Sequence, residues 1–236
     1  MEVLLSKTRY ALIGHGTYSF AEAERLTGVP AYTIRRWTKG YSYRYQGEDR
    51  HSPPIIATHA RYTEGGPALD FADLLEVRFL DAFRRYGVGA WAIRIASLRA
   101  QELLGRPRPF STQIFKTDGR TVLAELVPEA GDPHLLDLVR DQYEFSKVVD
   151  PFLYSGIEFN QLQEPCRWWP LGDARKVVID PKRSFGAPIV SESGVPTAVL
   201  AAGFAAEGSL EFVAQWYRVT LDEVKDAVEF ETSHAA

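Results

Sequence analysis

Residues 19–37, SFAEAERLTGVPAYTIRRW, predict two short helices joined by a tight turn. Ser19 and Glu22 have the spacing of a capping box, in which each side chain accepts a hydrogen bond from the other residue's backbone amide, so a helix begins there. Gly28 permits the left-handed backbone that ends such a helix. Pro30 suits the first turn of the next helix, because its missing amide costs nothing there. The stretch therefore predicts a helix-turn-helix.

The second of these helices has a cationic face. Ile34 and Trp37 lie three positions apart and should pack on the first helix, so Arg35, Arg36 and Lys39 should point away from the core. No acidic residue occurs between positions 31 and 39. We expect this helix to bind DNA rather than to be only a solvated basic surface.

Within that helix we expect Thr33 and Arg36 to contact base edges, since an arginine can bond a guanine through two atoms. Other side chains of the helix and of the strand after it should contact phosphates. These are Arg35, Lys39, Tyr41, Tyr43 and Arg44.

The segments after this helix predict a wing and two more helices. The alternating tyrosines of residues 41–45 indicate a strand, residues 46–54 a loop, and residues 55–62 a returning strand. Apolar residues at helical spacing predict a helix from Asp70 to Gly87 and another over residues 90–104.

Beyond residue 110 the sequence predicts a small β region and then a second three-helix unit. Residues 112–127 should form a hairpin around an Asp118-Gly119 turn, followed by short strands. Thr220 to Glu223 form another capping box in the helical tail. We expect an α+β protein of three parts: a DNA-binding winged helix-turn-helix (1–110), a β-rich connecting region (111–170) and a helical domain (171–236).

The two three-helix units differ in charge. Residues 1–62 carry 9 Lys or Arg against 5 Asp or Glu, whereas residues 111–236 carry 11 against 20. The last helix, residues 221–231, has five carboxylates and a single lysine. Phosphates would repel that helix, because binding to nucleic acid depends on neutralising phosphate charge. We therefore expect the N-terminal unit to bind DNA and the C-terminal unit to bind protein.

Two stretches also resemble known families. Residues 18–41, YSFAEAERLTGVPAYTIRRWTKGY, resemble the MerR-like and excisionase-like helix-turn-helix family. Residues 176–231 resemble a winged-helix domain of unknown function found in antitoxins, whose pattern is matched by Ile179, Asp180, Pro181, Gly186, Pro188, Val195 and Pro196. Where that family usually has Gly-Thr-Arg, this chain has Glu192, Ser193 and Gly194.

In this order the two stretches resemble VapB-type antitoxins of type II toxin–antitoxin systems. The resemblance covers nearly the whole chain. It implies a dimeric autorepressor that binds its own promoter and inhibits a PIN-domain ribonuclease by direct contact.

The toxin-contacting residues are harder to find. Trp168 and Trp169 are adjacent, and successive side chains of a strand face opposite ways, so one of them could be an exposed anchor for a partner. Packing in a core is the alternative for both. The acidic tail could complement a basic ribonuclease or could simply be solvated.

The remaining composition argues against an enzyme. The chain has one cysteine, and its five histidines are scattered, so we expect no metal site and no disulfide. Phosphate-binding loops and nucleophile elbows are absent, and we expect no catalytic residue and no cofactor. With neither a signal peptide nor an apolar run long enough to span a membrane, a cytoplasmic location is expected.

Two other functions remain open on the sequence alone. One is an effector-responsive MerR-like transcription regulator without a toxin partner, whose β region would bind a small molecule. The other is a protein-interaction scaffold without a role on DNA, which a flat salt response in duplex binding would indicate.

Overall fold

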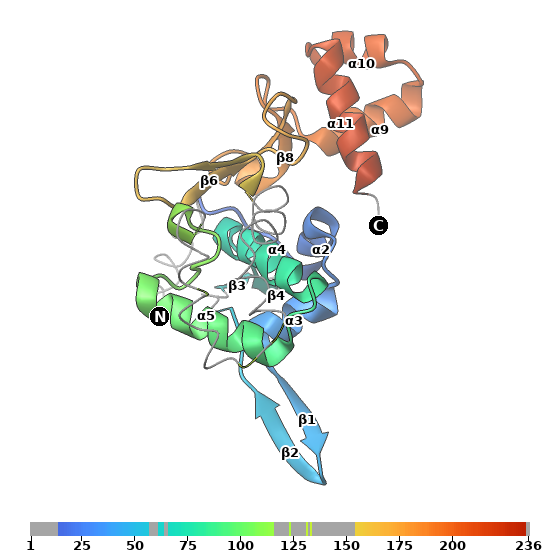
Figure 1. The fold of residues 1–236 in the computed structure, drawn as a ribbon. Helices are drawn as coiled ribbons and strands as arrows, with labels where there is room; N and C mark the ends of the chain where they lie inside the picture. The colour runs from blue at the N-terminus through green and yellow to red at the C-terminus, as the bar shows by residue number, and fades with distance from the viewer. Residues whose placement is uncertain are drawn as a thin grey trace, which may run out of the picture. The chain divides into compact units, whose positions relative to one another are not determined.

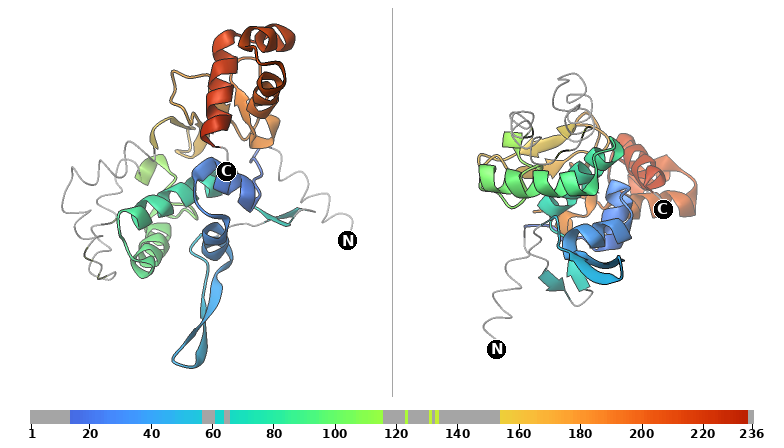
Figure 2. Two further views of the ribbon diagram at one scale, coloured as in Figure 1. Left: turned by 90° about the vertical axis from the view of Figure 1, so that its right-hand side faces the viewer. Right: turned by 60° about the horizontal axis from the view of Figure 1, so that its bottom comes forward.

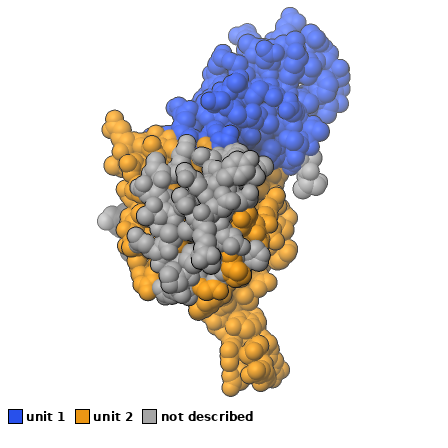
Figure 3. All heavy atoms as spheres, in the orientation of Figure 1, with its two compact units in different colours: residues 1–18, 155–158, 166–236 blue, residues 19–154, 159–165 orange. Residues whose placement is uncertain are grey.

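The computed structural model describes residues 14–56, 61–63, 66–115, 123, 131, 133 and 154–234. The chain divides into two compact units, shown in Figure 3. The N-terminal unit comprises residues 19–154 and 159–165, and the C-terminal unit comprises residues 1–18, 155–158 and 166–236. Helices and strands occur together, so the predicted α+β class is confirmed.

The predicted helix-turn-helix is present in the N-terminal unit. Helices α2 (Phe20–Thr27) and α3 (Ala31–Lys39) flank a short turn. Ser19 and Glu22 form the capping box, and Gly28 ends α2 in the left-handed conformation with a φ of 70°. Helix α3 has no side-chain cap at its start.

A narrow two-stranded hairpin follows α3 and extends away from the helices of its unit (Figures 1 and 2). Strand β1 (Tyr41–Tyr45) was predicted, but the returning strand was not. It is β2 (Glu48–Ser52), which lies in the segment expected to be a loop, and the connection is only Gln46 and Gly47. Both of these residues have positive φ, as two-residue hairpin turns of this type require.

A second, shorter hairpin precedes the helical core of this unit. It consists of β3 (Arg61–Thr63) and β4 (Gly66–Ala68), paired antiparallel. Helices α4 (Phe71–Arg85) and α5 (Ala90–Leu104) follow, close to the predicted bounds. The core is built around α4, which is buried on most of its circumference, with Leu74, Leu75, Phe79, Leu80 and Phe83 almost completely buried.

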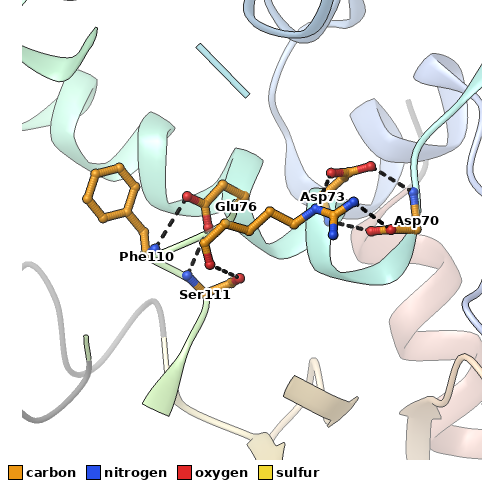
Figure 4. A network of polar contacts seen from close by, with 6 residues as sticks. Asp70, Asp73, Glu76, Phe110 and Ser111 are labelled. Carbon is orange, nitrogen blue, oxygen red and sulfur yellow. Dashed lines mark hydrogen bonds and ion pairs between the residues drawn. The ribbon is translucent and has the colours of Figure 1, made fainter. Parts of the chain in front are cut away.

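Polar groups of α4 hold the chain that follows α5 (Figure 4). The buried Glu76 carboxylate accepts hydrogen bonds from the backbone amides of Phe110 at 3.3 Å and Ser111 at 2.9 Å. Nearby, Arg108 donates to Asp73 at 2.5 Å and to Asp70 at 2.7 Å. This network fixes residues 108–111 against α4.

The hairpin predicted over residues 112–127 is wrong where the structure describes it. Residues 113–115 and Leu123 are helical rather than extended. The predicted Asp118-Gly119 turn falls outside the described residues.

The C-terminal unit contains a four-stranded sheet and three helices. The sheet order is β5 (Ile157–Phe159), β6 (Pro165–Trp168), β7 (Val177–Ile179) and β8 (Pro188–Val190), all at predicted strand positions. A 3-10 turn, η2 (Ser184–Gly186), precedes β8. The helices are α9 (Thr197–Glu207), α10 (Leu210–Tyr217) and α11 (Leu221–Ser233), and the last begins at the predicted Thr220 capping box.

The three helices share a small core with the sheet. It consists of Val190, Leu200, Val213, Val224 and Ala227. Helix α9 packs on both α10 and α11, which gives the tri-helical arrangement predicted for this part of the chain.

Candidate nucleic-acid interface

Helix α3 divides into a buried face and a cationic face. Ile34 and Trp37 are buried, and Thr38 is buried beside them. In contrast, Arg35, Arg36 and Lys39 are all exposed. The expectation that these three cations point away from the core is therefore confirmed, and they are free to meet a charged ligand.

Aromatic rings lie beneath these cations. The Arg36 guanidinium lies 3.7 Å from the centroid of the Tyr41 ring, and its hydrogen bond is the main cause that lowers the pKa of the Tyr41 hydroxyl. Arg35 and Lys39 lie 5.6 and 5.8 Å from the Phe20 ring centroid. A ring face attracts a cation and limits the conformations of its side chain, so the charges are partly preorganised.

An open groove of about 420 Å³ lies between α3, the base of the hairpin and α5. Three of its lining residues are arginines, and none is acidic. The lining residues are Tyr32, Thr33, Arg36, Trp37, Tyr41, Tyr43, Ser52, Ile55, Arg84, Ala90, Trp91 and Arg94. Cationic and aromatic walls suit a phosphate backbone with its sugars and bases.

Buried hydrogen bonds fix the hairpin at its root. Arg94 on α5 donates to the Ser52 hydroxyl at 2.8 Å and to the Pro54 carbonyl at 3.3 Å. The backbone carbonyl of Trp37 accepts from the amides of Ile55 and Ile56. Because α3 and α5 both hold the strand ends, the hairpin and the cationic helix form one rigid surface.

The strand residues predicted to bind phosphates are differently placed. Tyr41 is half-buried at the hairpin root, whereas Tyr43 and Arg44 are exposed further along β1. Asp49 lies opposite Arg44 in the antiparallel pair, with 4.0 Å between its carboxylate and the guanidinium. This carboxylate reduces the positive charge that Arg44 offers, so α3 carries the stronger cationic surface.

Two further residues of this surface were not predicted from the sequence. Trp91 is 65% exposed and lines the groove together with Arg84, whose half-exposed side chain is ion-paired to Asp81 at 2.6 Å. Helix α5 buries Ala92, Ile93 and Ala96, so its periodicity already places Trp91 off the core face. A tryptophan on the solvent-facing side of a predicted helix was therefore the feature of the sequence that could have indicated this part of the surface.

The adjacent tryptophans of the C-terminal unit have separate environments. Trp168 is only 4% exposed and packs in the core, so it is not available as an exposed anchor, and the core alternative holds for it. Trp169 is half-buried, and its indole nitrogen donates to Glu158 at 2.8 Å. The expected partner contact therefore remains a proposal for Trp169 alone.

Metal-binding side chains do not gather in the parts of the chain that the structure describes. No group of three or more His, Cys, Asp or Glu side chains with the geometry for a metal ion occurs among the described residues. Cys166 is half-buried, and burial raises the pKa of its thiol. Among the described helices, none has the length and apolar character to cross a membrane.

Two family models match the chain, one towards its N-terminus and one towards its C-terminus. Residues 16–97 match a family described as "Putative DNA-binding HTH domain". Residues 177–230 match a family described as "Protein of unknown function (DUF433)". The first match spans α2, α3, the hairpin and most of α5.

Full-length relatives come from Mycobacterium tuberculosis (strain ATCC 25618 / H37Rv). The chain is 32% identical to "Putative antitoxin VapB45", over 90% of this chain and 92% of that protein. It is 24% identical to "Uncharacterized protein Rv2308", with 93% and 92% covered. The X-ray crystal structure of Rv2018 from M. tuberculosis superposes with a TM-score of 0.70 at 31% identity, covering 89% of this chain and 96% of that one.

Proposed function

Because the chain belongs to the VapB45 family of antitoxins, we propose that it neutralises a PIN-domain ribonuclease by direct binding and represses its own promoter. The name of the relative supports the antitoxin role, and the helix-turn-helix match supports the binding of DNA. In this role the chain is a regulator rather than an enzyme.

The observation that carries the proposal is the exposed cationic face of α3, which has no counterpart on α11. Helix α3 exposes three cations with no acidic neighbour on the same helix. Helix α11 exposes Asp222 and Glu229, of which Asp222 lies 3.8 Å from Lys225 and Glu229 is ion-paired to Arg175. Phosphates are attracted to α3, whereas α11, with Lys225 as its single cation, offers no comparable cationic face.

We infer that α3 enters the major groove of the promoter. Arg36 and Thr33 then contact base edges, and Arg35, Lys39, Tyr43 and Arg44 contact phosphates. The groove lined by Arg84 and Trp91 extends this contact along the backbone. A homodimer places two α3 helices in successive major grooves about 34 Å apart.

The DNA role is tested with a duplex covering the region upstream of the chain's own reading frame. Wild type should bind this duplex more tightly than a scrambled one, and Arg36→Ala should remove most of that preference, by about ten-fold in affinity. Arg25→Ala, which changes an arginine on α2, is the matched control. Equal binding to both duplexes by the wild type would reject promoter recognition.

The antitoxin role is tested by expressing the tagged chain in its native host and identifying the protein that co-purifies. We expect a small ribonuclease whose RNA cleavage stops when the chain is added and resumes when the chain is degraded. Purification of the chain alone, or a partner without ribonuclease activity, would contradict the proposal.

A further inference from the structure

Two large aromatic side chains of the C-terminal unit stack on each other in solvent. Phe212 and Trp216 of α10 are 45% and 71% exposed. Their ring centroids are 5.9 Å apart, with 19° between the ring planes. They lie four residues apart, and Val213 on the other face of the helix is fully buried. The pair is therefore not part of the core of its unit.

The neighbouring helix is also apolar beyond its core face. Helix α9 buries Thr197 and Leu200, yet its exposed side chains include Val199, which is 38% exposed, and several alanines. Tryptophan is among the residue types that contribute most to binding energy at protein interfaces, and phenylalanine is enriched in them. An exposed stacked pair thus indicates an interface.

The charged side chains near the aromatic pair indicate which class of partner this surface would bind. Residues 197–233 contain seven carboxylates and two cationic side chains, but Glu223 and Asp226 are buried and Glu229 is ion-paired to Arg175. Glu207 and Glu211, beside the aromatic pair in sequence, are exposed. Hydrogen bonds from its own backbone amide and from the Ser209 hydroxyl lower the pKa of Glu211, which keeps it ionised.

The exposed carboxylates beside the aromatic pair argue against two kinds of binding partner. Nucleic acid is repelled, because the surface offers carboxylates where phosphates need cations. A second copy is disfavoured, because a two-fold contact places the same acidic patch on both sides. A cationic protein is attracted, and the aromatic pair supplies the apolar contact that such a partner can bury.

We propose that Phe212 and Trp216, with Glu207 and Glu211 beside them, form the docking face for the cationic RNA-binding surface of the ribonuclease partner. The inference rests on the proposed antitoxin function and adds which residues of the chain contact the ribonuclease. The stacked rings occupy the place of two stacked bases, and the carboxylates occupy the place of phosphates. Inhibition is then competitive with RNA.

The test measures the affinity of the full chain for the purified ribonuclease that co-purifies with it. Trp216→Ala should weaken this affinity at least ten-fold. Glu207→Lys should weaken it less, and more so at low salt, because it changes a rim charge. Leu162→Ala is the control, since Leu162 is a similarly exposed apolar residue but lies in the other unit.

A second readout separates docking from folding. Trp216→Ala should keep the thermal unfolding midpoint and the duplex affinity of the wild type, because the side chain is mostly solvated. Increasing concentrations of single-stranded RNA should displace the wild-type chain from the ribonuclease. Displacement by RNA together with the loss on Trp216→Ala supports the docking face.

Three results would overturn the inference. One is an unchanged ribonuclease affinity for Trp216→Ala, which leaves the antitoxin function intact but places its contact elsewhere. Another is a wild-type dimer that Trp216→Ala converts to monomers, which assigns the face to a second copy. A third is inhibition that RNA does not relieve. If no ribonuclease binds the wild type, the proposed function itself fails.

Discussion

Glu76 links stability to pH at the scale of a single residue. Its carboxyl is completely buried on α4, and burial raises its pKa to about 8 from an ordinary value of 4.5. The folded state therefore holds a proton that the unfolded state releases between these two pH values. The stability due to the protonated form is complete below about pH 4.5 and is lost as pH rises toward 8.

We expect the free energy of unfolding to fall with rising pH in this window, by up to about 1.4 kcal/mol per pH unit. Denaturant titrations at several pH values measure it. Glu76→Gln removes the titration and should flatten the slope, although it also weakens one of the two hydrogen bonds to residues 110 and 111. The same slope in both proteins would mean that another group is responsible.

Gly40 is the residue on which the hairpin root depends. It has a φ of 71° and a ψ of −175°, a conformation that is essentially confined to glycine. A Cβ atom there would clash with the carbonyl oxygen of Ser52, and the clash is with backbone that cannot rotate away.

Gly40→Ala should therefore destabilise the N-terminal unit by about 2–4 kcal/mol and displace the hairpin. Gly47→Ala is the control, because Gly47 also has positive φ but nothing lies within 4 Å of its added Cβ. It should cost only about 1 kcal/mol. Thermal unfolding compares the two variants, and equal effects would show that contact with Ser52 is unimportant.

At the scale of elements, helix α5 contributes more to the candidate interface than the sequence indicated. Its first turn supplies Trp91 to the groove, and Arg94 in the next turn holds the hairpin root. Trp91→Ala should lower duplex affinity about three- to ten-fold, because a contact of the ring with sugar or base is lost. Leu103→Ala, exposed on the same helix, should not change it. Gel-shift or anisotropy titrations distinguish the two.

The sequence predicted the elements that have strong local signals. The capping boxes at Ser19 and Thr220 and the glycine after α2 each set a helix end through residues close in the chain. Strand β2 was missed because its residues, EDRHS, are all polar and show no alternation. Gln46-Gly47 is a weaker turn signal than Asn-Gly, since glutamine rarely has positive φ.

The features that could not be predicted depend on contacts between residues that are far apart in the sequence. The groove is lined by α3, the hairpin and α5, and no local sequence pattern predicts that these elements pack next to one another. Trp168 and Trp169 are adjacent in sequence but have different exposure, which only the packing of the sheet decides. Phe212 and Trp216 could have been found, because Val213 marks the core face of their helix and leaves both on another side.

At the scale of the whole molecule, the helix-turn-helix near the N-terminus and the three helices near the C-terminus carry opposite net charge. Shape alone does not assign their ligands, since helix-turn-helix folds bind both DNA and protein. We expect the two activities to separate: Arg36→Ala should lose DNA affinity and keep the ribonuclease, and Trp216→Ala should do the reverse. The affinities of each variant for DNA and for the ribonuclease are measured in parallel. A variant that loses both affinities would contradict the assignment of the two ligands to separate surfaces.

The dependence of duplex affinity on salt tests the central claim most directly. The logarithm of the binding constant should fall linearly with the logarithm of salt concentration, with a slope of about −0.9 for each phosphate neutralised. Arg35→Ala and Lys39→Ala should each reduce the slope by about one, Arg36→Ala should lower the preference for the promoter sequence more than the slope, and Lys225→Ala on α11 should leave the slope unchanged. A flat response to salt, or slopes that change only on substitution of Lys225, would contradict a cationic α3 as the surface that binds DNA.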